Sequence, residues 1–168
     1  MRPGQLHASL QEPARLQALW MHQALNLSPP VPGDGLLTAR DARVRAAAIR
    51  TLPGADTMPH LEKLVADPHA RVRVEAVRAL GRQGTARAAE LALTALDRAM
   101  DPFLDYALWL TINELAEPWL AAVKSGAWKI AGREKHLEFG LNSVEPALAS
   151  EVLALLVGRQ GIPRDGSG

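Results

Sequence analysis

The chain contains no cysteine in its 168 residues. It therefore forms no disulfide, binds no metal through thiolates, carries no cysteine nucleophile and attaches no c-type haem covalently. Because chains without cysteine occur in both reducing and oxidising surroundings, the compartment stays open. The absence limits the chemistry available to the chain without placing it in the cell.

Aromatic residues, net charge and long apolar runs are also scarce. With two Phe and one Tyr beside many Ala and Leu, the composition favours helices over strands. The formal net charge of +1 is far from the strongly basic balance of an electrostatic nucleic-acid binder. The longest apolar run, residues 152–157, is too short to cross a bilayer, and the first residues lack the apolar core of a signal peptide. We therefore expect a soluble chain that does not insert into a membrane.

The sequence shows no combination of residues typical of a catalytic or metal site. Its five histidines are isolated, and no pair has metal-ligand spacing. A phosphate-binding glycine loop and a Gly-x-Ser-x-Gly nucleophile turn are both missing. We therefore predict a chain that is not an enzyme, with no catalytic residue, no cofactor and no metal.

An eleven-residue segment occurs twice, 28 positions apart. Residues 42–52 read ARVRAAAIRTL and residues 70–80 read ARVRVEAVRAL, with seven of the eleven positions identical. Apolar residues recur in both copies at the spacing of one helix face, so each copy predicts a helix that packs along a shared seam. The seam residues are Val44, Ala48, Ile49 and Leu52 in the first copy and Val72, Ala76, Val77 and Leu80 in the second. A repeat without reactive groups favours a stacked helical scaffold that binds something.

Prolines and glycines divide the rest of the chain into about nine helices. We expect these helices at residues 13–27, 41–52, 58–66, 70–82, 85–98, 102–116, 118–124, 133–142 and 144–159. Asp67-Pro68 and Asp101-Pro102 begin successive hairpins 34 positions apart, so the period is loose. Thr57 and Asp101 are the expected N-caps of the helices that follow them. The stretch 103–115 is apolar on nearly every side, which predicts the most buried helix.

Three charged residues carry a resemblance to HEAT repeats. Arg45 and Arg73 follow the repeated valines directly, and Asp67 precedes Arg73 by six positions. This pattern resembles the structural ladder of HEAT repeats, in which an acidic residue of one repeat hydrogen-bonds to a basic residue of its neighbour. Ala39 stands at the position equivalent to Asp67, so the first copy departs from the pattern. The resemblance implies an all-α, HEAT-like α-solenoid of stacked antiparallel helical hairpins.

One helical repeat domain is expected to span residues 13–160. In this interpretation residues 1–12 form an N-terminal arm. Residues 161–168, rich in glycine, form a flexible tail or a cloning scar.

From Ala70 onward the sequence resembles the HEAT-repeat segment of planctomycete-type membrane-bound dehydrogenase-like, c-type haem-binding proteins. Its most specific parts are residues 100–101, 103–115 and 118–120, and the resemblance covers most of residues 14–142. Those proteins join a sugar-dehydrogenase-like β-propeller, helical repeats and a cytochrome c domain. The resemblance implies a noncatalytic module that spaces or docks the redox domains of a larger protein, in the periplasm or elsewhere outside the cytoplasmic membrane. Without a propeller or a Cys-x-x-Cys-His, this chain takes over no haem ligand and no catalytic residue.

Four arginines are the first candidates for an interaction surface. Within each repeat copy two arginines lie seven positions apart, so stacking places all four in neighbouring rows on one face. The four are Arg43, Arg50, Arg71 and Arg78. Their alternative role is to lie on solvated helix faces or to form ion pairs with Asp41, Glu62, Asp67 and Glu75.

Two tryptophans complete the candidate surface. Trp119 and Trp128 flank a helix and a glycine turn, which is compatible with half-exposed anchors for a protein partner or with packing residues. The expected partner is a protein or the adjoining domains of a longer chain. Nucleic acid is not expected, because the arginine row has no interleaved aromatic residues.

A group of aromatic and acidic residues gives the runner-up hypotheses. Phe103, Tyr106, Trp109 and Trp119 fill gaps between helices or line a pocket in which Asp105 or Glu114 transfers a proton. Arg43, Arg71, Trp109 and Asp105 also imitate the basic groove, tryptophan and acidic residue of HEAT-like alkylpurine DNA glycosylases. A HEAT-like DNA-binding protein or glycosylase is therefore the alternative function. A lyase-like chaperone for bilin attachment is the third.

Overall fold

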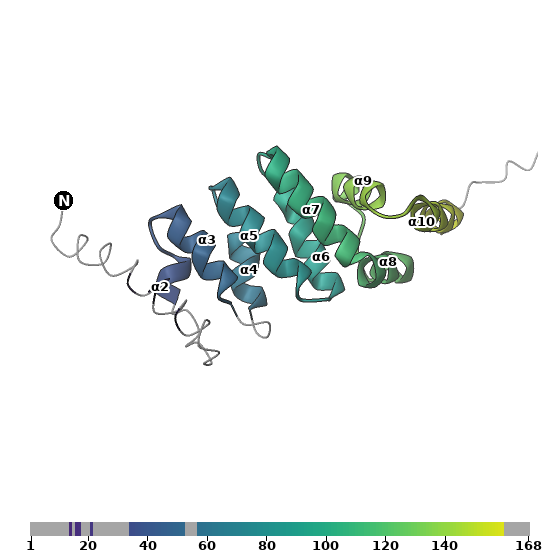
Figure 1. The fold of residues 1–168 in the computed structure, drawn as a ribbon. Helices are drawn as coiled ribbons and strands as arrows, with labels where there is room; N and C mark the ends of the chain where they lie inside the picture. The colour runs from purple at the N-terminus through teal and green to yellow at the C-terminus, as the bar shows by residue number, and fades with distance from the viewer. Residues whose placement is uncertain (1–13, 15, 18–20, 22–33, 53–56, 160–168) are drawn as a thin grey trace, which may run out of the picture.

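The computed structural model describes residues 14, 16–17, 21, 34–52 and 57–159. Every regular element among these residues is helical (Figure 1). The elements are α2 (Asp34–Leu37), α3 (Ala42–Arg50), α4 (Met58–Leu64), α5 (Ala70–Gly81), α6 (Ala86–Leu93), the 3₁₀-helix η1 (Thr94–Asp97), α7 (Pro102–Glu114), α8 (Ala116–Ser125), α9 (Glu134–Ser143) and α10 (Pro146–Arg159). The predicted all-α fold is confirmed. The arm, the tail and nearly all of the helix expected at 13–27 lie outside the described residues.

The helices form two layers in an elongated stack (Figure 1). α3, α5 and α7 lie side by side in one layer, each in contact with the next. α4 and α6 form the second layer against them, and α8 continues it beside α6. α9 packs on α7, and α10 packs on α8 and α9 at the far end. Each helical pair rests on the previous pair, which is the architecture of an α-solenoid.

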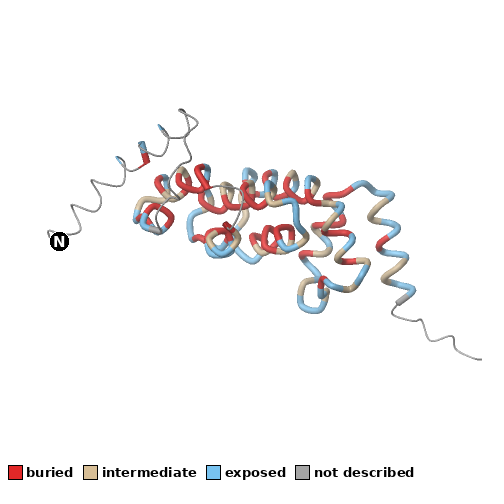
Figure 2. The backbone as a smooth tube through the Cα atoms, turned by 90° about the horizontal axis from the view of Figure 1, so that it is seen from below, coloured by how far each residue is buried: buried red, intermediate tan, exposed pale blue. Residues whose placement is uncertain are grey.

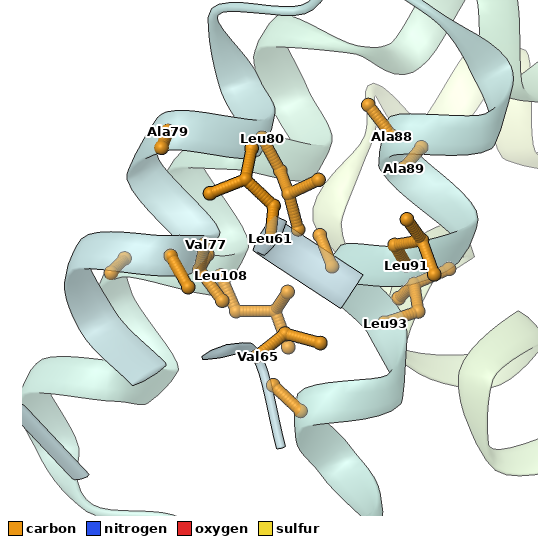
Figure 3. Packing of buried hydrophobic residues seen from close by; sticks show 14 of the residues in the cluster. Leu61, Val65, Val77, Ala79, Leu80, Ala88, Ala89, Leu91, Leu93 and Leu108 are labelled. Carbon is orange, nitrogen blue, oxygen red and sulfur yellow. The ribbon is translucent and has the colours of Figure 1, made fainter. Parts of the chain in front are cut away.

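The hydrophobic core lies between the two layers, where the helices turn their buried sides toward each other (Figure 2). Leu61 and Val65 come from the second layer, and Val77, Leu80 and Leu108 meet them from α5 and α7 (Figure 3). All five are at most 1% exposed. The eight seam residues of the repeat are all buried, so the predicted seam is confirmed.

The two expected N-caps differ in outcome. Asp101 caps α7 as predicted, because its Oδ1 accepts hydrogen bonds from the backbone N–H groups of Phe103 (2.9 Å) and Leu104 (2.8 Å). Thr57 occupies the N-cap position of α4 as predicted, but its side chain makes no capping hydrogen bond. Its backbone is already helical, with φ −94° and ψ −9°, and its hydroxyl accepts instead from Nε2 of Gln83 at 3.2 Å.

The helix expected at 85–98 is divided into α6 and η1. α6 has 8 residues and η1 has 4, whereas α4, the equivalent helix of the previous hairpin, has 7. This difference accounts for most of the change from the 28-residue spacing of the repeat copies to the 34-residue spacing of the two Asp-Pro pairs. The end of η1 also contacts α9. The carbonyl of Leu96 accepts a hydrogen bond from Nζ of Lys135, and Oδ1 of Asp97 lies 2.8 Å from Nε2 of His136.

α7 is not the uniformly buried helix that its apolar sequence predicts. Leu104, Leu108 and Ile112, four residues apart, are completely buried against the neighbouring helices. On its other side Phe103 is 81% exposed, Tyr106 63% and Trp109 43%. We call these three residues the aromatic stripe. The prediction failed because α7 lies in one layer of a two-layer stack. The side of α7 that faces away from the other layer has no covering helix among the described residues.

Candidate interaction surface

The solvent side of α3, α5 and α7 brings the predicted arginines together with the aromatic stripe. We call it the α3–α5–α7 face and define it by Arg43, Arg50, Arg71, Arg78, the stripe, and the carboxylates of Asp41, Glu75 and Glu114. Ion pairs join the three helices across this face. Arg50 of α3 pairs with Glu75 of α5, and Arg78 of α5 pairs with Glu114 of α7.

Three of the four arginines have a carboxylate partner on this face. The exposed Arg43 donates to Asp41 Oδ2 at 3.1 Å, and its side-chain hydrogen bond holds the pKa of Asp41 below its usual range. The hydrogen bond to Glu75 raises the pKa of Arg50. Arg78 holds Glu114 with two hydrogen bonds of 2.9 and 3.0 Å and donates to the Thr111 hydroxyl at 2.8 Å. These three arginines therefore form ion pairs that link residues near one helix or on two neighbouring helices.

Arg71 is exposed and forms no side-chain ion pair with any described residue. It lines a pocket of about 480 Å³ between the N-terminal ends of α5 and α7, a volume within the usual range of ligand sites. The other lining residues are His69, Ala70, Val74, Asp101 and Phe103. We call it the α5–α7 pocket.

Trp119 and Trp128 are not exposed anchors, which corrects their assignment to the surface. Trp119 is 0% exposed and Trp128 5% exposed, with ring centroids 6.0 Å apart in an edge-to-face arrangement. After α8, Gly126 adopts a left-handed conformation with φ 79°, and the chain folds back so that Trp128 N–H donates to the Ala122 carbonyl. The guanidinium of Arg133 then covers the Trp128 ring at 5.7 Å.

The sequence predicts helix packing or a pocket for the residues of the aromatic stripe, but the structure places them on the surface. The Tyr106 and Trp109 rings stack with centroids 5.9 Å apart and an interplanar angle of 24°. The signal was present in the sequence: the three rings are spaced by three residues, whereas the core leucines and isoleucine are spaced by four. Two apolar stripes with different spacing diverge around the helix, so only one can face the core.

The ladder residues Arg45, Asp67 and Arg73 lie together at the N-terminal ends of α3 and α5. Arg45 donates from Nε to Asp67 Oδ2 at 2.8 Å and from Nη2 to Oδ1 at 2.9 Å, with both side chains largely buried. This pairing raises the pKa of Arg45. Arg45 and Arg73 also bind backbone carbonyls at equivalent positions, Ala39 and Asp67, at 2.7 and 2.8 Å. This contact with a backbone carbonyl is therefore made in both copies and does not need a carboxylate at position 39.

The runner-up chemistry finds little support in the placement of its residues. Glu114 is engaged by Arg78, and Asp105 is exposed in the first turn of α7. The α5–α7 pocket includes Arg71 but neither Trp109 nor Asp105. Over the described part of the chain, no three His, Asp or Glu side chains gather in a way that could hold a metal ion. No helix among the same residues is long and apolar enough to span a bilayer.

A second charge cluster ties α6 to the start of α9. Glu90 accepts a hydrogen bond from Arg87 at 2.7 Å and another from Arg133, and Arg87 also reaches Glu62 of α4 at 2.9 Å. Burial raises the pKa of Glu90, but the hydrogen bonds from Arg87 and Arg133 outweigh it and hold that pKa below its ordinary value. The folded state therefore prefers the ionised carboxylate.

We expect acid to remove the stability that this cluster contributes. Because the folded pKa of Glu90 is depressed, its contribution is complete above the unfolded pKa and is lost as the pH falls through the folded pKa. The free energy of unfolding, measured in urea between neutral pH and about pH 3, should fall less steeply for Glu90→Gln than for the wild type. Glu138→Gln, at an exposed position of α9, is the control and should keep the wild-type slope. Equal slopes for Glu90→Gln and the wild type would contradict the role of the cluster.

Comparison with known families finds a similarity over part of the chain. Residues 30–109 match the family model of HEAT repeats, so this part of the chain is similar to a HEAT-repeat segment. The match covers α2 to the middle of α7 and includes both repeat copies. No curated protein and no solved structure matches the chain significantly.

Proposed function

We propose that the chain is a noncatalytic helical-repeat module that binds a protein partner on its α3–α5–α7 face. The observation that carries this proposal is the aromatic stripe, three large rings that α7 holds in solvent beside a row of arginines. Tyr, Trp and Arg are the residue types that most often anchor protein interfaces, and a contiguous exposed aromatic group is unusual on a surface without a partner. The similarity to HEAT repeats supports the proposal, because such repeats generally form interaction scaffolds.

The rigidity of this surface favours binding without rearrangement. α7 is fixed by buried residues along its length, and Arg78 ties it to α5. The stacked Tyr106 and Trp109 rings restrict each other as well. A partner therefore meets rings that are already ordered, which reduces the entropy lost on association.

In its narrower form the proposal assigns the module to a larger redox protein, where it spaces or docks the dehydrogenase and cytochrome domains outside the cytoplasmic membrane. This form rests on the resemblance of residues 14–142 alone. Its test is the reading frame around the coding sequence. A propeller upstream and a Cys-x-x-Cys-His downstream would support it, and unrelated neighbouring domains would overturn it.

We expect the double variant Tyr106→Ser, Trp109→Ser to lose partner binding while it keeps its fold. Peptides selected from a random display library on the wild-type chain serve as the probe, and their affinity for the variant should fall about tenfold or more. The melting temperature should change little, because both side chains are exposed. The measurement is fluorescence anisotropy with the labelled peptides.

The matched control is Leu153→Ser, at an exposed apolar position of α10 that lies outside the α3–α5–α7 face. It should bind the selected peptides as the wild type does. Equal binding by the double variant and the control would contradict the proposal. Binding of an oligonucleotide in place of peptides, with an affinity that falls steeply with salt, would instead support the nucleic-acid alternative.

A further inference from the structure

We propose that the α5–α7 pocket binds an acidic side chain beside a large apolar side chain of the partner. This inference rests on the proposed function and names the chemistry that the same face recognises. The pocket combines an apolar lining with Arg71, which forms no ion pair with a described residue, whereas the other three arginines of the row each pair with a carboxylate.

The apolar half of the site comes from three residues. Ala70 and Val74 of α5 line one side, and the ring of Phe103 stands at the start of α7 with 81% of its surface exposed. A side chain placed among them would remove apolar surface from water on both partners. The volume of about 480 Å³ is large enough for a bulky apolar side chain together with a neighbouring polar group.

The charged half of the site is Arg71. Arg43, Arg50 and Arg78 each hold a carboxylate of this chain, but Arg71 has no such partner among the described residues. A carboxylate from the partner would complete the row, and the guanidinium can receive it with two parallel hydrogen bonds. This charge complementarity favours glutamate or aspartate over a neutral residue at that position of the partner.

Asp101 also lines the pocket, and one of its carboxylate oxygens is already engaged. Oδ1 accepts the N–H groups of Phe103 and Leu104, so the negative charge lies at the N-terminus of α7, where the helix dipole offsets it. His69 also lines the pocket, and its Nδ1 accepts a hydrogen bond from the Arg71 backbone N–H at 3.3 Å.

The pocket continues into the aromatic stripe, because Phe103 belongs to both. Phe103 and Trp109 are six residues apart on α7, a rise of about 9 Å along the helix. One short segment of a partner can therefore place its acidic and apolar pair in the pocket and cover the stripe with its next residues. The geometry points to an acidic, apolar peptide segment as the ligand of the whole face.

The test uses two synthetic peptides of the same length that differ in one atom group. One carries glutamate next to phenylalanine, and the other carries glutamine in place of the glutamate. We expect the glutamate peptide to bind the wild-type chain about tenfold more tightly, and Arg71→Glu to abolish this preference. Arg82→Glu makes the same charge change at an exposed position at the other end of α5 and should preserve the preference. Circular dichroism verifies that both variants are folded.

The outcomes separate this inference from the proposed function. If the two peptides bind equally, or Arg71→Glu and Arg82→Glu behave alike, while Tyr106→Ser, Trp109→Ser still abolishes binding, the pocket chemistry is wrong and the interaction face stands. If no peptide binds, or binding ignores the stripe, both proposals are overturned. A single-stranded oligonucleotide that binds with a steep salt dependence through Arg71 would replace the acidic peptide as the ligand.

Discussion

Replacing Gly140 of α9 with valine is expected to lower the free energy of unfolding by about 3 kcal/mol. A Cβ at this position would lie 2.3 Å from Cη2 of Trp119 and 2.6 Å from Cζ2. The indole cannot move aside easily, because Trp119 is completely buried and packs edge-on against Trp128. Removing a glycine from a helix gains at most about 1 kcal/mol, so the steric clash decides the sign. Urea unfolding followed by far-UV circular dichroism measures the loss.

Gly158 of α10 is the matched control. Among the described residues, no atom outside this stretch of α10 lies within 4 Å of a Cβ built there, so Gly158→Val meets no obstacle from them. Its free energy of unfolding should stay within about 0.5 kcal/mol of the wild-type value. Equal unfolding curves for the two valine variants would show that Trp119 does not fill the space beside α9.

Asp67→Ala is expected to cost about 3 kcal/mol, the second large effect. The change leaves Arg45, with 13% of its side chain exposed, without the carboxylate that accepts two of its hydrogen bonds. It also removes the acceptor for the His69 backbone N–H at 2.8 Å. A buried charge without its partner is much less stable than the intact pair. Chemical denaturation at neutral pH provides the measurement.

Two comparisons show whether burial is the cause. Glu62→Ala breaks an exposed ion pair with Arg87 and should cost less than about 1 kcal/mol. The double variant Arg45→Met, Asp67→Ala should recover part of the loss, because no charge is left buried alone. A loss for Glu62→Ala as large as that for Asp67→Ala would contradict the importance of the buried pair.

The features that the sequence predicted well are the local and repeated ones. The seam residues of the two copies are buried, and Asp101 caps α7, because these properties depend on neighbours three or four residues away in the same helix. The repeat also made the contact between α3 and α5 predictable, since two nearly identical surfaces stack in the same way. Pattern and structure agree wherever one repeat determines the environment of the next.

The features that the sequence missed depend on distant partners. Whether the aromatic residues of α7 are buried depends on whether a third layer covers them, and no local pattern contains that information. The burial of Trp119 needs the space beside Gly140, 21 positions later in the chain. The pairing of Arg78 with Glu114 spans 36 positions and connects a repeated helix to one that does not keep the repeat. In each case the sequence shows the charged or aromatic residue itself, but it does not show which residues contact it in the folded chain.

The contacts between η1 and α9 affect how this solenoid opens. In a stack where each unit touches only its neighbours, the end can fray one helix at a time. Here Lys135 and His136 of α9 contact η1, the 3₁₀-helix that follows α6, and α9 also packs on α7. We infer that α9 cannot detach without breaking contacts with both α7 and the η1 end of the α6 segment. Its slowest-exchanging amide hydrogens should therefore exchange at rates close to those of α6 and α7, as one cooperative unit.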